Sequence, residues 1–226
     1  MDFTILAFCH PYCLEGKCNM HLSEIWHSKK NDCRLSRTQV IISFAVKEEM
    51  FDISFPNIRT VLTGVGKANA AYRLTKAISA GRPDIVINIG TAGTKDYSVG
   101  DILVSKHFID RDLTPLEIEG VEVEIETQCH LNLPSIIGCD KRTCGCIVNS
   151  GDDFVTADEA FVGDVVDMEA FALASVCKNE GIDFVAVKYI TDIIGQNSVK
   201  HWNEKLICAN AALHEYFNNH IMPEIV

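Results

Sequence analysis

The sequence contains no long uninterrupted run of apolar residues. A helix that spans a bilayer needs about 20 consecutive apolar residues, so we expect no transmembrane segment and no membrane partner. The N-terminus also has no positively charged stretch followed by a long apolar one, which a secretory signal requires. Residues 4–8 lead directly into cysteine, histidine and proline. We therefore expect the protein to be cytoplasmic.

Basic residues are in short supply. Twenty lysines and arginines stand against 31 aspartates and glutamates, which gives a formal net charge of -11. A protein that binds nucleic acid or an anionic membrane surface usually presents a basic face. The charge balance therefore predicts no nucleic-acid partner, although one local site can still be positive enough for an anionic small molecule.

No CxxC pair occurs among the ten cysteines. Because cytosolic thiols stay reduced, we expect no disulfide framework. Zinc is conceivable near the N-terminus, but the spacing there fits no familiar site and we predict no metal. The residues in question are Cys9, His10, Cys13, Cys18, His21, His27 and Cys33. Cys129, Cys139, Cys144 and Cys146 are spaced as irregularly, and Cys177 lies in an apolar helical run where we expect it in the core.

The length of 226 residues, with 47% apolar and 23% charged residues, suits one soluble domain. Residues 1–38 differ from the rest because they show no clear periodicity and few branched aliphatics. We interpret them as an atypical, cysteine-rich N-terminal extension that packs poorly. Residues 39–226 are predicted to form the functional domain.

Strand and helix patterns alternate along that domain. Apolar runs and period-two alternation predict strands at residues 40–46, 59–63, 84–89, 102–104, 121–125, 146–148 and 184–190. Helical spacing and glycine stop signals predict helices at 67–79, 168–179 and 203–219. The fold class is therefore α/β, a three-layer α/β/α arrangement with a central mixed, largely parallel sheet. In such sheets ligands bind beyond the carboxyl ends of the strands, which directs attention to residues 64–66, 90–93, 150–154 and 191–192.

Gly64-Val-Gly-Lys-Ala-Asn69 follows a strand and opens a helix, as a dinucleotide fingerprint does. Its third glycine is replaced by Asn69, and the acidic residue Asp84 precedes the next strand instead of following it. A nicotinamide cofactor is therefore the weakest alternative, and tight packing explains these glycines equally well. Gly90-Thr-Ala-Gly93 ends a buried strand, where small residues let backbone N–H groups approach an oxygen-rich ligand or simply turn the chain.

Three acidic positions stand near these strand ends. Glu169 opens an apolar helix, where an acid is favoured by the helix dipole but, if buried, needs donors such as ribose hydroxyls. Asp192 ends an apolar strand, so aliphatic surroundings should raise its pKa and suit proton donation near neutrality. Glu49 follows the first strand, and on its own an exposed charge is the default interpretation of residues 47–49.

Taken in order, the motifs resemble the nucleoside phosphorylase/nucleosidase superfamily, most closely its 5'-methylthioadenosine/S-adenosylhomocysteine nucleosidases. The resemblance covers roughly residues 40–220. The motifs that carry it are Phe44-Ala-Val-Lys-Glu-Glu49, Gly64-Val-Gly-Lys67, Pro83-Asp-Ile-Val-Ile-Asn-Ile-Gly-Thr-Ala-Gly93, Val99-Gly-Asp-Ile102, Ser150-Gly-Asp-Asp-Phe154, Val166-Asp-Met-Glu-Ala170 and Ile190-Thr-Asp192.

The resemblance implies a purine N-glycosyl hydrolase that releases adenine from an adenine nucleoside, with no cofactor, as a homodimer and within methionine salvage. It implies that Glu49 activates water, Glu169 holds the ribose hydroxyls and Asp192 protonates the purine at N7. The substrate-binding residues implied are Thr91, Ala92, Gly93, Phe154, Val155, Met168, Lys188, Thr191 and Trp202. Phe154 would stack on the base, Val155 would bind its edge through the backbone, and Trp202 would line the 5'-substituent pocket.

Two departures from the family pattern bear on this site. Lys188 stands where the family has an arginine, and its point charge cannot form the same bidentate fork. Asp167 replaces a glutamate. The segment between Val121 and Cys146 is also shorter than usual, which leaves the 5' pocket and the dimer contacts less defined by the resemblance.

Three other functions remain open on the sequence. A nucleoside phosphorylase would need several basic residues for phosphate, but no arginine cluster accompanies Lys67 and Lys188, and Glu49 would repel the anion. A hydrolase of another nucleoside, such as a futalosine-type compound, would differ only in variable loops. A non-enzymatic nucleoside-binding protein is disfavoured because Glu49, Glu169 and Asp192 are all present.

Overall fold

The computed structural model describes residues 38–134, 136–137, 146–155, 161–195 and 198–226. The predictions for the N-terminal extension, apart from Thr38, and for Cys139 and Cys144 lie outside these residues and stay predictions. No helix in the described ranges combines the length and apolarity that crossing a membrane requires.

Ten strands within the described residues form one sheet. They are β1 (Val40–Phe44), β2 (Ile58–Leu62), β3 (Ile85–Thr94), β4 (Ile102–Ser105), β5 (His107–Asp110), β6 (Glu124–Glu126), β7 (Ile136–Ile137), β8 (Ile147–Ser150), β9 (Val165–Asp167) and β10 (Asp183–Ile193). Parallel pairs join β2 to β1, β1 to β3 and β3 to β10, and also β5 to β8 and β8 to β9. The pairs of β3 with β9, β10 with β4, β4 with β7 and β5 with β6 are antiparallel. The predicted mixed, largely parallel sheet is confirmed.

The long strand β3 changes partner along one edge. Its first half pairs with β1 up to Asn88, and its end pairs with β9 from Gly93 onward. Residues 89–92 therefore have no strand partner on that edge within the described sheet, while β10 pairs continuously with the other edge up to a bulge. This gap leaves backbone N–H groups of β3 free to bind side chains.

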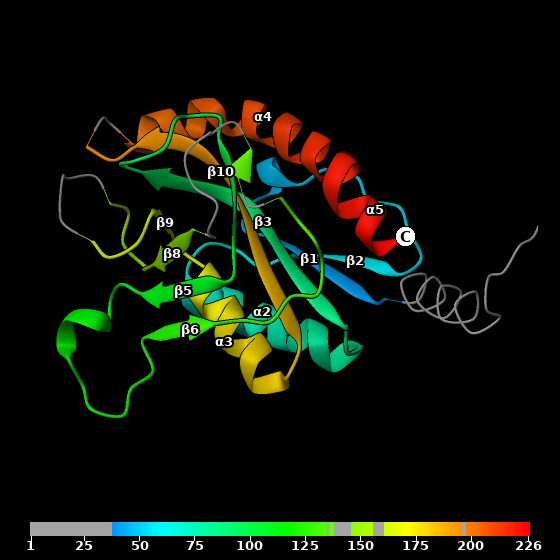
Figure 1. Ribbon diagram of the computed structural model, residues 1–226, viewed down its shortest axis with the longest axis horizontal. Coiled ribbons are helices and arrows are strands. Elements are labelled where there is room, and N and C mark those ends of the chain that lie inside the picture. The colour runs from blue at the N-terminus through cyan, green and yellow to red at the C-terminus, as the bar shows by residue number, and fades with distance from the viewer. Residues whose placement is uncertain (1–37, 135, 138–145, 156–160, 196–197) are drawn as a thin grey trace, which may run out of the picture. The chain divides into compact units, whose positions relative to one another are not determined.

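Helices cover both faces of the sheet (Figure 1). One face packs against α2 (Lys67–Ala80) and α3 (Ala170–Glu180), which lie side by side. The other packs against α4 (Ser198–Tyr216), a π-helical turn (Phe217–Ile221) and the short α5 (Met222–Ile225). The three-layer α/β/α prediction is confirmed.

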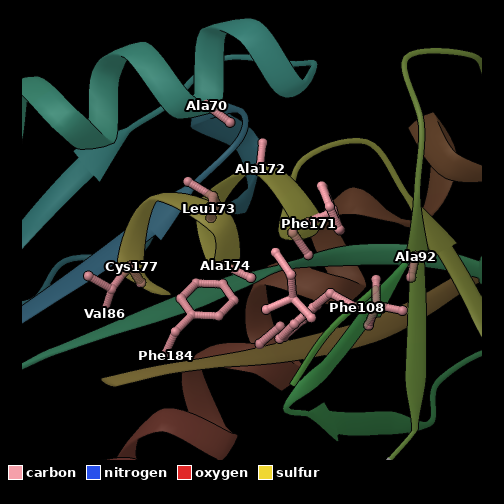
Figure 2. Packing of buried hydrophobic residues seen from close by; sticks show 14 of the residues in the cluster. Ala70, Val86, Ala92, Phe108, Phe171, Ala172, Leu173, Ala174, Cys177 and Phe184 are labelled. Carbon is pink, nitrogen blue, oxygen red and sulfur yellow. The ribbon is translucent and has the colours of Figure 1, made fainter. Parts of the chain in front are cut away.

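The core between the sheet, α2 and α3 combines aromatic and very small side chains (Figure 2). Phe108 and Phe184 pack with their ring centroids 5.1 Å apart. Ala170, Ala172 and Ala174 let α3 approach the sheet closely, because alanine adds little bulk to a helix surface. Cys177 is fully buried on the same helix, as predicted.

Most predicted elements are present, with shifted ends. β3 and β10 run through residues 90–93 and 191–192, where the sequence predicted strand ends, and all of these residues except Thr91 are buried. The half-exposed strand predicted at 121–125 is reduced to the three residues of β6. The short strands β5, β7 and β9 were not predicted, since runs of two to four residues carry little periodicity.

The core predicts a large cost for removing Leu173. Leu173→Ala deletes a fully buried side chain and should lower the free energy of unfolding by about 2–5 kcal/mol. For a chain of this size that is a fall of roughly 5–15 °C in Tm, measured by differential scanning calorimetry. Ile207→Ala is the control, because Ile207 is 84% exposed and its loss should shift Tm by no more than about 1 °C. Equal shifts in the two variants would contradict the assignment of the core.

Candidate active site

A cavity of about 340 Å³ opens at the carboxyl ends of the central strands. Pockets for small organic ligands start at about this size. The lining residues come from segments far apart in the sequence: Ala45, Val46, Glu49, Val65, Asn88, Ile89, Gly90, Thr91, Ala92, Gly93, Arg111, Asp153, Phe154, Val155, Val166, Asp167, Met168, Glu169, Lys188, Thr191, Asp192 and Trp202.

All twelve residues that the sequence predicted for the site line this one cavity. Their roles in binding and catalysis stay predictions, because shared location alone does not assign them. Arg111 and Asn88 were not predicted. Arg111 follows the unpredicted strand β5, and Asn88 was assigned only to the buried strand β3, so neither carried a separate signal.

Glu49 lies in a 3₁₀ turn, Lys47–Glu49, directly after β1. The default interpretation of this position as an exposed charge is wrong, because Glu49 is only 2% exposed. Its Oε1 accepts hydrogen bonds from the backbone N–H of Thr91 at 2.9 Å and from the Thr91 hydroxyl at 2.7 Å. The Thr91 N–H is free to do so because it faces the gap in the sheet. Oε2 accepts weaker bonds from the N–H groups of Ala45 and Val46.

Burial raises the pKa of Glu49 above its ordinary value of 4.5, although the Thr91 hydrogen bonds and the positive charge of Lys188 act in the opposite direction. A carboxylate of this kind takes up a proton more readily than an exposed glutamate. Glu49 therefore has the properties of a general base.

Lys188 forms a buried ion pair with Asp167. The distance from Nζ to Oδ2 is 2.7 Å, and both side chains are almost fully excluded from solvent. Lys188 and Asp167, the two residues that depart from the family pattern, thus contact each other. Burial alone would lower the pKa of Lys188, but the charges of Asp167, Glu169 and Glu49 outweigh it and the pKa is raised. Lys188 is therefore charged at neutral pH.

Asp167 is held by further hydrogen bonds. Its Oδ1 accepts one from the Ser150 hydroxyl, and Oδ2 accepts one from the N–H of Ala170 at 3.0 Å. The Ser150 oxygen in turn accepts from the N–H of Phe171. Asp167 lies in β9, and α3 begins at Ala170, two residues after the predicted start of the helix at residue 168. This network fixes the carboxylate that orients Lys188.

Glu169 caps the start of α3 and faces the cavity. Its Oε1 accepts a hydrogen bond of 3.0 Å from the N–H of Gly66. Gly66 has a φ of 92°, a region that favours glycine, so the tight turn before α2 needs this residue. Burial and the neighbouring charge of Asp167 raise the pKa of Glu169. One carboxylate oxygen remains for a ligand hydroxyl.

The Gly64–Lys67 turn does not offer a phosphate site. Besides the Gly66 N–H bound to Glu169, the N–H of Lys67 donates to Asp152 at 2.7 Å. Both N–H groups that would bind a pyrophosphate are thus occupied by carboxylates, and an anion there would be repelled. This geometry agrees with the interpretation of a nicotinamide cofactor as the weakest alternative.

A bulge between Ile190 and Asp192 shapes the end of β10. In a regular strand Thr191 and Asp192 would point to opposite faces, but the bulge lets both line the cavity. The Thr191 hydroxyl donates to Oδ1 of Asp192 at 2.8 Å. A Cβ at Gly93 would lie 2.9 Å from Oδ2 of Asp192, so the strand must carry glycine where this carboxylate crosses it.

Gly90 leaves a comparable space. A Cβ at this position would lie 3.5 Å from both carboxylate oxygens of Glu49 and from Nζ of Lys188. A small polar molecule in that space would meet an acceptor and a donor together. The glycines of Gly90-Thr-Ala-Gly93 therefore make room for charged side chains, which the sequence interpretation had not foreseen.

Aromatic side chains close another part of the cavity wall. The rings of Phe154 and Trp202 meet edge to face, with centroids 6.3 Å apart. The loop that carries Phe154 is fixed by Arg111, which donates to the backbone carbonyls of Asn149 and Asp153. Flat apolar walls beside polar groups suit a heteroaromatic ligand. Among the described residues, no group of three or more His, Cys, Asp or Glu side chains is arranged to hold a metal ion.

Comparison with known proteins finds a similar family and similar enzymes. The family model of the phosphorylase superfamily matches residues 49–135. A 5'-methylthioadenosine/S-adenosylhomocysteine nucleosidase of Marinomonas sp. (strain MWYL1) is 28% identical over 179 residues, which cover 67% of this chain and 75% of that protein. The enzyme of the same name from Staphylococcus aureus (strain bovine RF122 / ET3-1) is 34% identical over 152 residues, 58% of this chain and 66% of that protein. The chain is therefore similar to the phosphorylase superfamily and to its 5'-methylthioadenosine/S-adenosylhomocysteine nucleosidases.

Solved structures of two enzymes share the fold. A nucleosidase of Helicobacter pylori, crystallised with 5'-methylthioadenosine in its active site, has a TM-score of 0.68 at 18% identity and covers 82% of this chain and 99% of that one. The futalosine hydrolase of the same organism has a TM-score of 0.69 at 20% identity, with 83% and 98% covered. At identities of 18% and 20%, this similarity shows a shared fold and no more.

The buried carboxyl of Glu169 predicts a pH-dependent cost to stability. Its raised pKa means that the folded protein holds a proton which the unfolded chain releases above about pH 4.5, so the ionised group destabilises the fold as pH rises. Glu169→Gln should therefore raise Tm relative to wild type more at pH 8 than at pH 5. We expect a difference of roughly 2–4 °C, from about 1 kcal/mol in a chain of this size.

Thermal scans of both proteins at the two pH values measure this effect. Glu48→Gln is the control, because it removes an exposed carboxylate from the turn after β1. A Tm difference for Glu169→Gln that is the same at both pH values would contradict the prediction.

Proposed function

We propose that the protein hydrolyses the N-glycosidic bond of an adenine nucleoside, such as 5'-methylthioadenosine or S-adenosylhomocysteine, and releases adenine and the thioribose product. The observation that carries the proposal is that Glu49, Glu169 and Asp192 line one cavity together with Lys188. The names of the relatives from Marinomonas and S. aureus support the same reaction.

The attacking water fits the space above Gly90. There it can donate a hydrogen bond to Glu49 and accept one from Lys188, since both groups border that position. Water becomes a competent nucleophile when a base removes its proton, and the buried Glu49 carboxylate is suited to take it. The oxygen of the water then forms the new bond to C1' of the sugar.

The sugar develops positive charge as the C1'–N9 bond breaks. Glu169 places a carboxylate beside it, anchored through Oε1 to Gly66 and with its other oxygen directed to the ribose hydroxyls. Because burial raises the pKa of Glu169 to about 8, its ionised form is the one that stabilises the developing cation, and it does so strongly in a cavity with little water. Met168 packs beside the sugar on the same segment.

The purine leaves with the bonding electrons and must gain a proton. Asp192, buried and held by Thr191, donates this proton at N7. Phe154 provides a face on which the base stacks, and the backbone of Val155 binds its edge. The result is free adenine and a sugar that carries the hydroxyl from water, so atoms and charges balance. No cofactor enters the reaction.

Hydrolysis is favoured over phosphorolysis by the charges of the cavity. Lys188 is already paired with Asp167, and Glu49, Glu169 and Asp192 add further acidic groups around it. A phosphate dianion at the position of the water would face these carboxylates at close range. Futalosine hydrolysis remains the second candidate, because the H. pylori futalosine hydrolase has the same fold and the chemistry would use the same residues.

The resemblance also leads us to infer a cytoplasmic homodimer in methionine salvage. Leu116, Ile118 and Val121 lie exposed on one segment and give it an apolar surface, which suits contact with a second subunit.

Removing the acid tests the mechanism. Asp192→Asn should lower kcat for adenine release from 5'-methylthioadenosine by about 10²–10⁴-fold, since general acid catalysis contributes that much. The measurement is adenine release followed by liquid chromatography across a panel of nucleosides that includes S-adenosylhomocysteine and futalosine. Asp52→Asn, which changes an exposed aspartate, should keep the wild-type rate. Near-normal turnover by Asp192→Asn would refute the role of the acid.

A further inference from the structure

Trp202 is connected to Glu49 through the hydroxyl group of Thr91. The indole Nε1 of Trp202 donates a hydrogen bond of 2.9 Å to Thr91 Oγ1. That hydroxyl in turn donates to Glu49 Oε1 at 2.7 Å. The three side chains come from α4, β3 and the turn after β1, so this chain of hydrogen bonds crosses the cavity wall between distant segments.

The direction of the two hydrogen bonds follows from the chemistry of the donors. An indole N–H can donate but cannot accept, so Thr91 Oγ1 must be the acceptor in its contact with Trp202. A threonine hydroxyl has a single proton, and the contact with Trp202 leaves that proton free for the carboxylate. Trp202 therefore favours the one hydroxyl orientation in which Thr91 donates to Glu49.

We propose that Trp202 is a positioning residue for the catalytic base, and that it acts by fixing the Thr91 hydroxyl on Glu49. The inference rests on the proposed function, in which Glu49 activates water. It goes beyond the expectation that Trp202 lines the 5'-substituent pocket, because an aromatic ring without an N–H would line the pocket equally well.

The other groups that face Glu49 cannot substitute for this control. The N–H groups of Ala45, Val46 and Thr91 are fixed by the backbone, and they donate whatever the state of Trp202. Lys188 acts through its charge, and Glu169 is the neighbouring acid that opposes it. The Thr91 hydroxyl is thus the donor to Glu49 that can rotate away, and Trp202 is the group that holds it.

The consequence is a change in the proton affinity of Glu49. The Thr91 hydroxyl stabilises the carboxylate and so lowers the pKa of Glu49 against the effect of burial. Without the Trp202 N–H the hydroxyl can rotate, this stabilisation weakens and the pKa rises. The base is then protonated at higher pH, and the acidic limb of the pH–rate profile moves upward.

The test uses Trp202→Phe, which keeps an aromatic ring but removes the donor. The carboxyl carbon of Glu49 is followed by NMR in protein labelled with ¹³C-glutamate, with its signal assigned by its loss in Glu49→Gln. We expect the titration midpoint to rise by about half a pH unit in Trp202→Phe and by about one pH unit in Thr91→Val, which removes the donor itself. The double variant should titrate like Thr91→Val alone, because Trp202 acts through Thr91.

Several results would overturn the inference. One is an unchanged titration midpoint of Glu49 in Trp202→Phe. Another is a shift in the double variant that equals the sum of the two single-variant shifts. Ile207→Ala is the control for disturbance of α4, since Ile207 is 84% exposed on the same helix, and it should leave the midpoint unchanged. Loss of the folded state would be seen as a fall in Tm, and Trp202→Tyr then provides a second aromatic replacement without the indole N–H.

Kinetics separate this inference from the proposed function. If the wild type hydrolyses 5'-methylthioadenosine, the ratio of kcat/KM in wild type to that in Trp202→Phe should be about threefold larger on the acidic limb of the pH profile than at the pH optimum. A change in KM alone would mean that Trp202 only lines the pocket. If the wild type releases no adenine, the proposed function fails, yet the NMR titration still decides whether Trp202 controls Glu49.

Discussion

The site depends on the buried ion pair between Lys188 and Asp167. An isolated ammonium or carboxylate would be costly to bury, so each of these groups requires the other. Their contact joins β10 to β9 across β3, where Gly90 lies opposite Lys188 in the sheet. Burial raises the pKa of Glu49 and of Glu169. The positive charge of Lys188 acts in the opposite direction, which allows both side chains to be buried beside it.

The gap along the edge of β3 gives this charge cluster its shape. Because β3 exchanges β1 for β9, the Thr91 N–H faces a carboxylate instead of a neighbouring strand. The bulge in β10 turns Asp192 toward the same space. These irregularities of the sheet therefore bring the carboxylates of the cavity together, while the regular strands and helices pack around them. Such local departures from ideal geometry are common near functional sites.

The sequence predicts the layers and the location of the site well, since long buried strands such as β3 and β10 carry a strong pattern and their carboxyl ends indicate where ligands bind. It does not predict that Glu49 is buried, because a run of three charged residues is usually exposed. It also does not predict that Lys188 and Asp167 pair, since side chains 21 positions apart meet only through the register of the sheet. The hydrogen bond from Trp202 to Thr91 is likewise set by the docking of α4 and has no local sequence signal.

The central claim is that these buried acids direct water to a nucleoside sugar. The most direct measurement is to incubate the purified protein with 5'-methylthioadenosine in phosphate buffer and identify both products by mass spectrometry. The account predicts adenine and free methylthioribose in equal amounts. A sugar 1-phosphate as the product, or no cleavage of any adenine nucleoside, would contradict it.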